Sequence, residues 1–307
     1  RKHDGRMTVT GTTLRAMSLR AGERKTLSYQ IQFHRRGYYR IGPLLQETGD
    51  LLGFYRKCRV VTEPHYILVY PKVLTIDGWD VASPRPVGVI VAGDLSFECG
   101  ESGDYATIGK LVKPLRQAGL SVHLLLGNHD NREHFLAAFP EAKEQAAVDP
   151  GQLGKCVSLL ETPFANWFLL DSKYQGTYGQ LGEPQLEWLA KALDARAERP
   201  ALLVAHHDPD RGGKAGSLLD SKSFFRLILP RKQVKAYFFG HSHCWSVGQE
   251  NDVHLVNIPG NVWLFDHSQP RGFITAQLRS DGADFVIHNL DSKHPKHGNK
   301  FSLRWRA

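Results

Sequence analysis

Short runs of apolar residues recur in the second part of the chain, and each run ends at a glycine or a polar residue. They occupy residues 87–92, 122–126, 201–205 and 235–239. Continuous apolar runs of this length predict strands that are buried on both faces. The spacing of apolar residues between the runs predicts helices at 104–118, 184–197 and 221–229. Strands that alternate with helices predict an α/β domain over residues 87–307.

The first part of the chain follows a different pattern. Residues 26–33 alternate between apolar and polar with period two, which is typical of a half-buried strand. Turn signals separate further short apolar segments after it. We therefore predict a small all-β module over residues 1–75. Residues 76–86 contain glycine, serine and two prolines, which predicts a linker between this module and the α/β domain.

The composition is that of a globular protein. The chain of 307 residues is long enough for a sizeable core, and 41% of its residues are hydrophobic and 23% are charged. No apolar run approaches the ~20 residues that span a bilayer. The chain does not open with a basic and then apolar signal sequence. These features favour a cytoplasmic protein without a transmembrane segment.

The formal net charge of +8 is concentrated near the N-terminus. Residues 1–82 carry 14 Lys or Arg and 7 Asp or Glu, whereas the remainder carries 25 and 24. The nearly neutral α/β domain does not have the basic surface that nucleic-acid binding requires, so nucleic acid is not expected as a partner. The sequence does not indicate an oligomeric state.

Polar residues follow four of the predicted strands, at the point where each strand ends. Open α/β sheets place ligand sites at the carboxyl ends of their strands, so we expect these residues to converge. They supply a carboxylate, an amide oxygen and imidazoles, which suit a divalent cation such as Mn, Fe, Zn or Co. The candidate metal ligands are Asp94, Asn128, His206, His241 and His243.

Four short motifs carry these residues: Gly-Asp at 93–94, Gly-Asn-His-Asp at 127–130, His-His at 206–207 and Gly-His-Ser-His at 240–243. In this order and at these strand ends, they resemble the motifs of the calcineurin-like metallophosphoesterase superfamily, over about residues 83–307. The resemblance implies an α/β fold, a layered β-sandwich flanked by helices. It also implies an enzyme that hydrolyses small phosphomonoesters or phosphodiesters by metal-bound hydroxide, with one or two divalent cations per chain.

The resemblance implies a role for each ligand. Asp94 would bridge two cations, because one carboxylate oxygen can contact both. Asn128, His206 and His241 would complete the second cation site together with Asp94. His243 would belong to the first cation site.

Two further residues of the second motif are candidates for catalysis. His129 follows a ligand on a tight turn, where its imidazole would stabilise developing charge or protonate the leaving alkoxide. Asp130 is expected to fix the tautomer of His129.

One motif of the superfamily is missing. The superfamily pattern begins with Asp-x-His at the end of a first strand, yet no Asp-x-His occurs upstream of Asp94. Asp77 and Asp80 precede Asp94 by only 17 and 14 residues, which leaves too little chain for both a strand and a crossover helix. Only Asp94 and His243 would then remain at the first cation.

The N-terminal segment has a resemblance of its own. Residues 35–43, 48–50, 53–54 and 69–71 are similar to motifs of the bacterial domain-of-unknown-function family 58, over about residues 1–75, which implies no catalysis. Two interpretations of the whole chain therefore remain open. One is a metallophosphoesterase whose activity is weakened by the loss of the first motif. The other is a non-catalytic fusion or interaction protein with a degenerate one-metal site.

Overall fold

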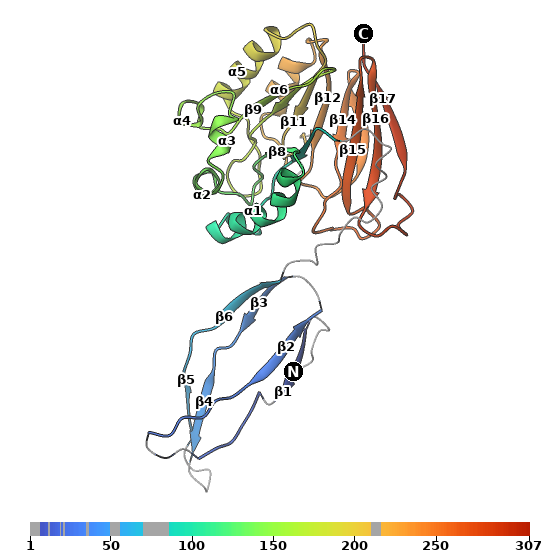
Figure 1. Cartoon of the computed structure of the whole chain (residues 1–307). Coiled ribbons are helices and arrows are strands. Elements are labelled where there is room, and N and C mark those ends of the chain that lie inside the picture. Colours follow the sequence, from blue (N-terminus) through green and yellow to red (C-terminus); the bar gives the residue numbers. More distant parts are fainter. Residues whose placement is uncertain are drawn as a thin grey trace. The chain divides into compact units, whose positions relative to one another are not determined.

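The computed structural model of the chain describes residues 7–11, 13–18, 20, 22–34, 37–49, 56–69, 86–209 and 216–307. Two compact units are present, Arg1–Gly78 and Trp79–Ala307 (Figure 1). Almost all of the predicted linker lies outside the described residues, and so do Asp77 and Asp80. The boundaries at residues 75 and 86 therefore stay predictions.

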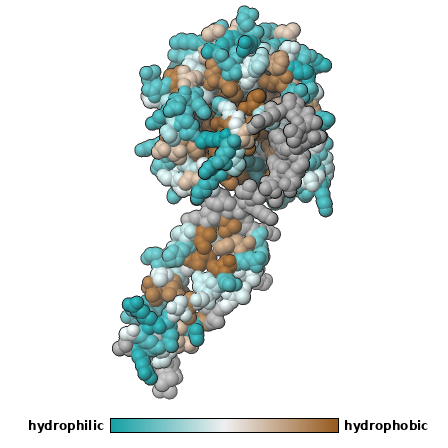
Figure 2. Space-filling model, in the orientation of Figure 1, coloured by the Kyte–Doolittle hydropathy of each residue, from teal (hydrophilic) through white to brown (hydrophobic). Residues whose placement is uncertain are grey.

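The described part of the first unit contains strands and no helix. The strands pair as antiparallel ribbons, β1 with β2, β3 with β6 and β4 with β5. They are β1 (Met7–Gly11), β2 (Tyr29–Phe33), β3 (Gly37–Ile41), β4 (Leu45–Gly49), β5 (Arg56–Val60) and β6 (His65–Val69). The strand predicted at 26–33 is thus present as β2. No residue of this unit whose burial the structure describes is buried, and Figure 2 shows hydrophobic residues on its surface.

The second unit is built on a six-stranded sheet in the order β13-β14-β12-β11-β10-β9. Strands β10, β11, β12 and β14 run parallel, and the edge strands β9 and β13 pair antiparallel. The bounds are β9 (Ser158–Glu161), β10 (Asn166–Leu169), β11 (Ala201–Val204), β12 (Val234–Phe239), β13 (Ser246–Glu250) and β14 (Val253–Asn257). The apolar runs predicted as strands at 201–205 and 235–239 form two of its central strands.

The predicted helices are present within a few residues of their expected ends. They are α1 (Ser102–Gln117), α5 (Glu183–Asp194) and α6 (Ser221–Ile228). In α1, the Glu101 and Asp104 side chains form a capping box that satisfies free amide groups of the first turn. Three short helices that the sequence analysis did not predict are α2 (Arg132–Ala138), α3 (Glu141–Glu144) and α4 (Pro150–Leu153).

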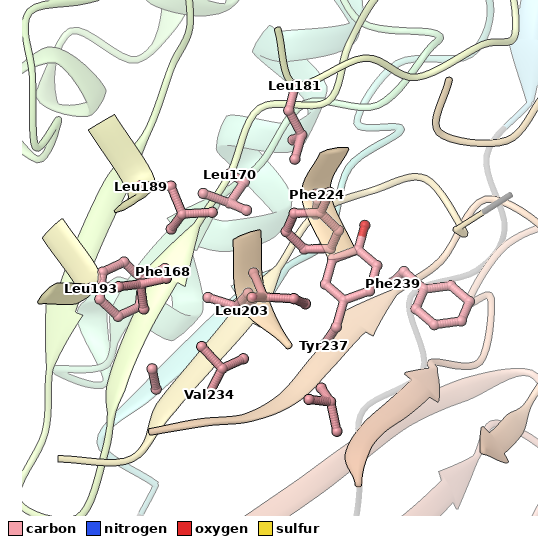
Figure 3. Packing of buried hydrophobic residues seen from close by; sticks show 14 of the residues in the cluster. Phe168, Leu170, Leu181, Leu189, Leu193, Leu203, Phe224, Val234, Tyr237 and Phe239 are labelled. Atoms are coloured by element: carbon pink, nitrogen blue, oxygen red, sulfur yellow. The ribbon is translucent and has the colours of Figure 1, made fainter. Parts of the chain in front are cut away.

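One face of the six-stranded sheet is covered by helices. Successive side chains along a strand point to opposite faces, so a sheet buried on both sides has two apolar faces. On this face Phe168, Leu203 and Tyr237 pack with Leu189 of α5 and Phe224 of α6 (Figure 3). All five side chains are fully buried.

The other face is covered by a second layer of strands. Leu202, Val204 and Phe238 pack there against Phe285 and Leu303. The latter two belong to an antiparallel sheet in the order β15-β16-β17. Its strands are β15 (Gly272–Arg279), β16 (Gly282–Asn289) and β17 (Lys300–Arg304).

A parallel pair, β7 (Gly88–Val91) and β8 (Ser121–Leu124), packs on the same face of the six-stranded sheet. Ala92 and Leu125, which follow these strands, belong to the same hydrophobic cluster. Helices α1 and α2 pack on the pair through Tyr105, Phe135 and Phe139. The unit is therefore a layered β-sandwich flanked by helices, as predicted. Among the described residues, no helix is long and apolar enough to cross a membrane.

We expect Leu203→Ala to lower the free energy of unfolding by about 2–5 kcal/mol, because it leaves a cavity between the six-stranded sheet and its helices. Urea unfolding followed by circular dichroism measures the change. Leu111→Ala on α1 is the control, since Leu111 is 43% exposed and its truncation should cost less than about 1 kcal/mol. Equal losses of unfolding free energy in the two variants would contradict this packing.

Candidate metal centre

Asp94 lies on a sharp turn directly after β7. Gly93 and Asp94 both have positive φ angles, 103° and 53°. The carboxylate of Asp94 accepts a hydrogen bond from the backbone N–H of His129 at 3.2 Å. Its other oxygen lies 3.2 Å from Nε2 of His206. The turn therefore aims the carboxylate between the chain that follows β8 and the chain that follows β11.

Two glycines leave room for this arrangement. A Cβ on Gly93 would lie 2.6 Å from Nδ1 of His206, and a Cβ on Gly127 would lie 2.1 Å from Oδ1 of Asp94. Distances this short are far inside van der Waals contact. Any side chain at Gly127 would therefore displace the Asp94 carboxylate.

Three further candidate ligands, which follow β8, β11 and β12, join this group. Oδ1 of Asn128 lies 2.9 Å from Nδ1 of His241. Nδ1 of His206 lies 2.7 Å from the carbonyl oxygen of Ala92, which leaves its Nε2 to face Asp94. The rings of His206 and His241 are 5.3 Å apart between centroids. Asp94, Asn128, His206 and His241 are thus brought together from four strand ends.

His243 lies at the edge of this group. Burial lowers its pKa. The charge of Asp94 opposes this shift, and the charges of His206 and His129 add to it. Asp94, His241 and His243 all adopt positive φ angles, an uncommon conformation for residues other than glycine. Among the described residues, the other non-glycine cases are Asn251 and Asp252, in the turn between β13 and β14. Strained backbone at three candidate ligands is typical of a functional site.

The spacing within two pairs of donor atoms is compatible with a divalent cation. Two donors bound to one ion at about 2.1 Å each lie roughly 3 Å apart when they are adjacent in its coordination shell. The observed separations of 3.2 Å for Asp94 with His206, and 2.9 Å for Asn128 with His241, agree with this value. Nδ1 of His243 is buried and has no hydrogen-bond partner within the described ranges.

Electrostatics keep Asp94 and His241 in the form that binds a cation, whereas Asp94 raises the pKa of His206 despite burial. Burial lowers the pKa of His241 to about 4, so its imidazole is neutral at pH 7. Burial by itself would raise the pKa of Asp94, but nearby His206 and His129 lower it below its ordinary value. An ionised carboxylate and neutral imidazoles are the states required of metal ligands.

His207 is also part of the cluster, although the sequence analysis did not assign it as a ligand. One nitrogen from each of His206, His207 and His241 lies within 4.8 Å of the others. Nδ1 of His207 lies 2.7 Å from the hydroxyl of Ser172, and burial lowers the pKa of His207 to about 2. Its direct adjacency to His206 is the signal in the sequence that indicates its position.

His129 is partly exposed, and its ring does not face Asp130. Nδ1 of His129 lies 3.3 Å from the carbonyl oxygen of Glu98 instead. The expectation that Asp130 fixes the tautomer of His129 is therefore wrong. The two side chains point different ways because the carboxylate of Asp130 is buried and committed to the backbone.

Asp130 holds the two ligand-bearing turns together. Its carboxylate accepts hydrogen bonds from the backbone N–H groups of Gly127 at 2.8 Å and of Leu95 and Ser96 at 3.2 Å. The hydroxyl of Tyr105 donates a fourth bond at 3.1 Å. Asp130 thus fixes the chain after β7 relative to the chain after β8.

Sequence reasoning missed the residues that follow β10. Lys173 donates from Nζ to the carbonyl oxygen of Asn128 at 3.3 Å. Next to it, Asp171 forms a bidentate ion pair with Arg132, at 2.6 and 2.9 Å. These residues follow an apolar run at a strand end, as the candidate ligands do. That position in the sequence could have indicated that they lie near the site.

Gly127→Ala should abolish tight metal binding, because the new Cβ would occupy the position of the Asp94 carboxylate. Isothermal titration with Mn²⁺ measures the affinity, and circular dichroism reports whether the fold is kept. Gly248→Ala is the matched control, since a Cβ there meets nothing within 4 Å. Unchanged affinity in Gly127→Ala would contradict the proposed position of the metal.

The metal-free protein should lose stability as the pH falls from 7.5 to 5.5. In the unfolded chain His207 and His241 take up protons near pH 6.5, whereas in the folded protein burial keeps them neutral down to about pH 2 and 4. Their contribution to the free energy of unfolding is therefore full above pH 6.5 and is lost progressively below it. His206 opposes the trend, because Asp94 raises its pKa despite burial.

Melting temperatures in EDTA at several pH values test this expectation. In the variant His207→Gln the free energy of unfolding should depend less steeply on pH, and the slope should be smaller by up to about 1.4 kcal/mol per pH unit. A slope identical to that of the wild type would contradict the neutral state of His207.

Comparisons with known proteins indicate the family of this chain. The sequence profile of the calcineurin-like phosphoesterase family matches residues 70–245. A probable glycerophosphodiester phosphodiesterase GpdQ from Arcobacter nitrofigilis is 28% identical over 212 residues, which are 66% of this chain and 71% of that protein. The cyclic adenosine monophosphate phosphodiesterase CpdA from Pseudomonas aeruginosa is 29% identical over 59% of this chain and 63% of that protein.

One solved structure shows the same fold. A dimetal phosphatase from Danio rerio superposes with a TM-score of 0.51 at 12% identity, over 66% of this chain and 79% of that one. The match to the family profile begins at residue 70, so it covers the predicted linker and the last residues of the predicted β module. The resemblance of residues 1–75 to family 58 stays a prediction. Because the profile covers more than half of the chain, this protein belongs to the calcineurin-like phosphoesterase family.

Proposed function

We propose that this chain is a metal-dependent phosphodiesterase. The observation that supports the proposal is that Asp94 lies 3.2 Å from His206, and Asn128 lies 2.9 Å from His241, where four strands of the sandwich end. The relatives named above are phosphodiesterases, which supports phosphodiesters as the substrate class.

Each candidate residue has a role in this proposal. Asp94, Asn128, His206 and His241 would hold one divalent cation, and Asp94 and His243 would contact a second. When bound, such ions polarise the phosphate oxygens and activate water. The oxygen, amide and imidazole donors suit Mn, Fe, Zn or Co.

His129 would act on the substrate. Its backbone N–H holds the Asp94 carboxylate, while its partly exposed imidazole stays available to the substrate side. From there the imidazole would donate a proton to the departing alkoxide. Asp130 would be a positioning residue, since it fixes the turn that carries His129.

The first cation site is the weak point of the centre. Asp94 and His243 are its candidate ligands within the described residues, and two protein ligands rarely hold a catalytic cation without further donors. We infer one tightly bound cation per chain and slow hydrolysis. The same observation favours the second candidate function, a non-catalytic interaction protein that keeps a one-metal site.

Metal analysis and turnover separate the two functions. We expect one tight Mn²⁺ per chain and measurable hydrolysis of bis(p-nitrophenyl) phosphate. His129→Ala should lower kcat by about 10²–10⁴-fold without loss of the metal, because it removes a proton donor and no ligand. His65→Ala, an exposed histidine of the first unit, is the control. A protein that binds Mn²⁺ but hydrolyses no substrate would contradict the enzyme proposal and would favour the one-metal interaction protein.

A further inference from the structure

Exposed aromatic side chains lie beside the candidate metal centre. Val262, Trp263 and Phe265 belong to the loop between β14 and β15 and are 47%, 57% and 73% exposed. Large apolar side chains that gather on a surface mark binding sites more often than single exposed ones do. No role has been given to this loop in the proposed hydrolysis.

The loop packs directly on a candidate ligand. The ring of Phe265 stacks on the imidazole of His243, with centroids 4.8 Å apart and planes inclined by 16°. A Cβ on Gly260, at the start of the loop, would lie 3.1 Å from the carbonyl oxygen of Trp263 and 3.4 Å from Cβ of His243. The ring of Phe265 therefore lies beside a candidate metal ligand, and the backbone of Trp263 lies next to Gly260 in the same loop.

Hydrogen bonds hold the loop in place. The backbone N–H of Gly272 donates to the carbonyl oxygen of Gly260 at 3.0 Å, which closes the loop at its base. The side chain of Gln269 accepts a bond from the backbone N–H of Trp245 at 3.1 Å. A surface that is ordered before the ligand arrives loses less conformational entropy on binding.

The composition of the loop discriminates between the substrates of the relatives. Those relatives include enzymes for glycerophosphodiesters and for cyclic nucleotides, according to their names. A glycerol group has no flat apolar face, whereas a nucleobase stacks on aromatic side chains. A residue that served only to support His243 would not need an aromatic ring with 73% of its surface exposed.

We propose that Trp263 and Phe265 form a stacking platform for the base of a nucleotide phosphodiester whose phosphate lies at the metal centre. The proposal rests on the proposed phosphodiesterase function and names its substrate class. The platform makes no covalent bond, so it acts on substrate binding and on the choice between substrates.

Turnover of two substrates tests the platform. The variants Trp263→Leu and Phe265→Leu keep apolar bulk and remove the ring. With Mn²⁺ present, each should lower the ratio of kcat/KM for cyclic AMP to that for glycerophosphocholine by about 5- to 100-fold, mainly through KM. Phe164→Leu, which removes a 48% exposed ring in the turn between β9 and β10, should leave the ratio unchanged. Equal losses for both substrates would overturn the proposal, because the rings would then act only through His243.

Binding without turnover separates this proposal from the proposed function. In EDTA, calorimetric titration should show that cyclic AMP binds the wild type and binds each ring-deleted variant about 5- to 100-fold more weakly. If the wild type hydrolyses neither substrate yet shows this pattern, the phosphodiesterase proposal fails and the platform stands. If wild type and variants bind cyclic AMP equally, the platform is wrong even when hydrolysis is robust. Binding of phosphatidylglycerol vesicles in place of cyclic AMP would also overturn it.

Discussion

The close approach of the Asp94 carboxylate to the turn at Gly127 and to His206 is the constraint on which the candidate centre depends. It requires a residue without a side chain at Gly93 and at Gly127, because a Cβ at either place would overlap the atoms of the site. It also requires a left-handed backbone at Asp94. Such a conformation costs about 1–3 kcal/mol and persists only where the surroundings enforce it. The hydrogen bonds of Asp130 to both turns help to hold the backbone of Asp94 in this conformation.

The centre joins the two layers of the sandwich. Asp94 and Asn128 follow the pair β7–β8, whereas His206 and His241 follow the central strands of the six-stranded sheet. The two sets of ligands can meet only if the layers pack in one register, which Ala92, Leu125 and the facing side chains determine. A bound cation would therefore stabilise the packing of the layers as well as the ligands, since metal binding adds to the free energy of folding.

The motifs and the loops carry different parts of the function. The donor atoms follow buried strands, whose positions are set by packing on both faces. The aromatic loop between β14 and β15 lies on the surface, where sequence can change without cost to the core. Its contact with His243 places this adaptable segment next to the candidate chemistry. Family membership thus indicates the type of reaction, and the loop would influence the choice of substrate in the proposed function.

The order of apolar runs, the helical spacing and the polar residues at the strand ends were sufficient to predict an α/β domain and to indicate Asp94, Asn128, His206, His241 and His243 as candidate ligands. Those features are local, because strand ends and their ligands are neighbours in the chain. The layered sandwich was implied by the resemblance of the motifs to a known family. The tertiary structure decided three features that the sequence analysis did not predict. They are the hydrogen-bond partners of Asp130, the position of His207 in the histidine cluster, and the stacking of Phe265 on His243. Each is a contact between segments far apart in the sequence. The direction in which such side chains point depends on backbone angles and packing that no local pattern records.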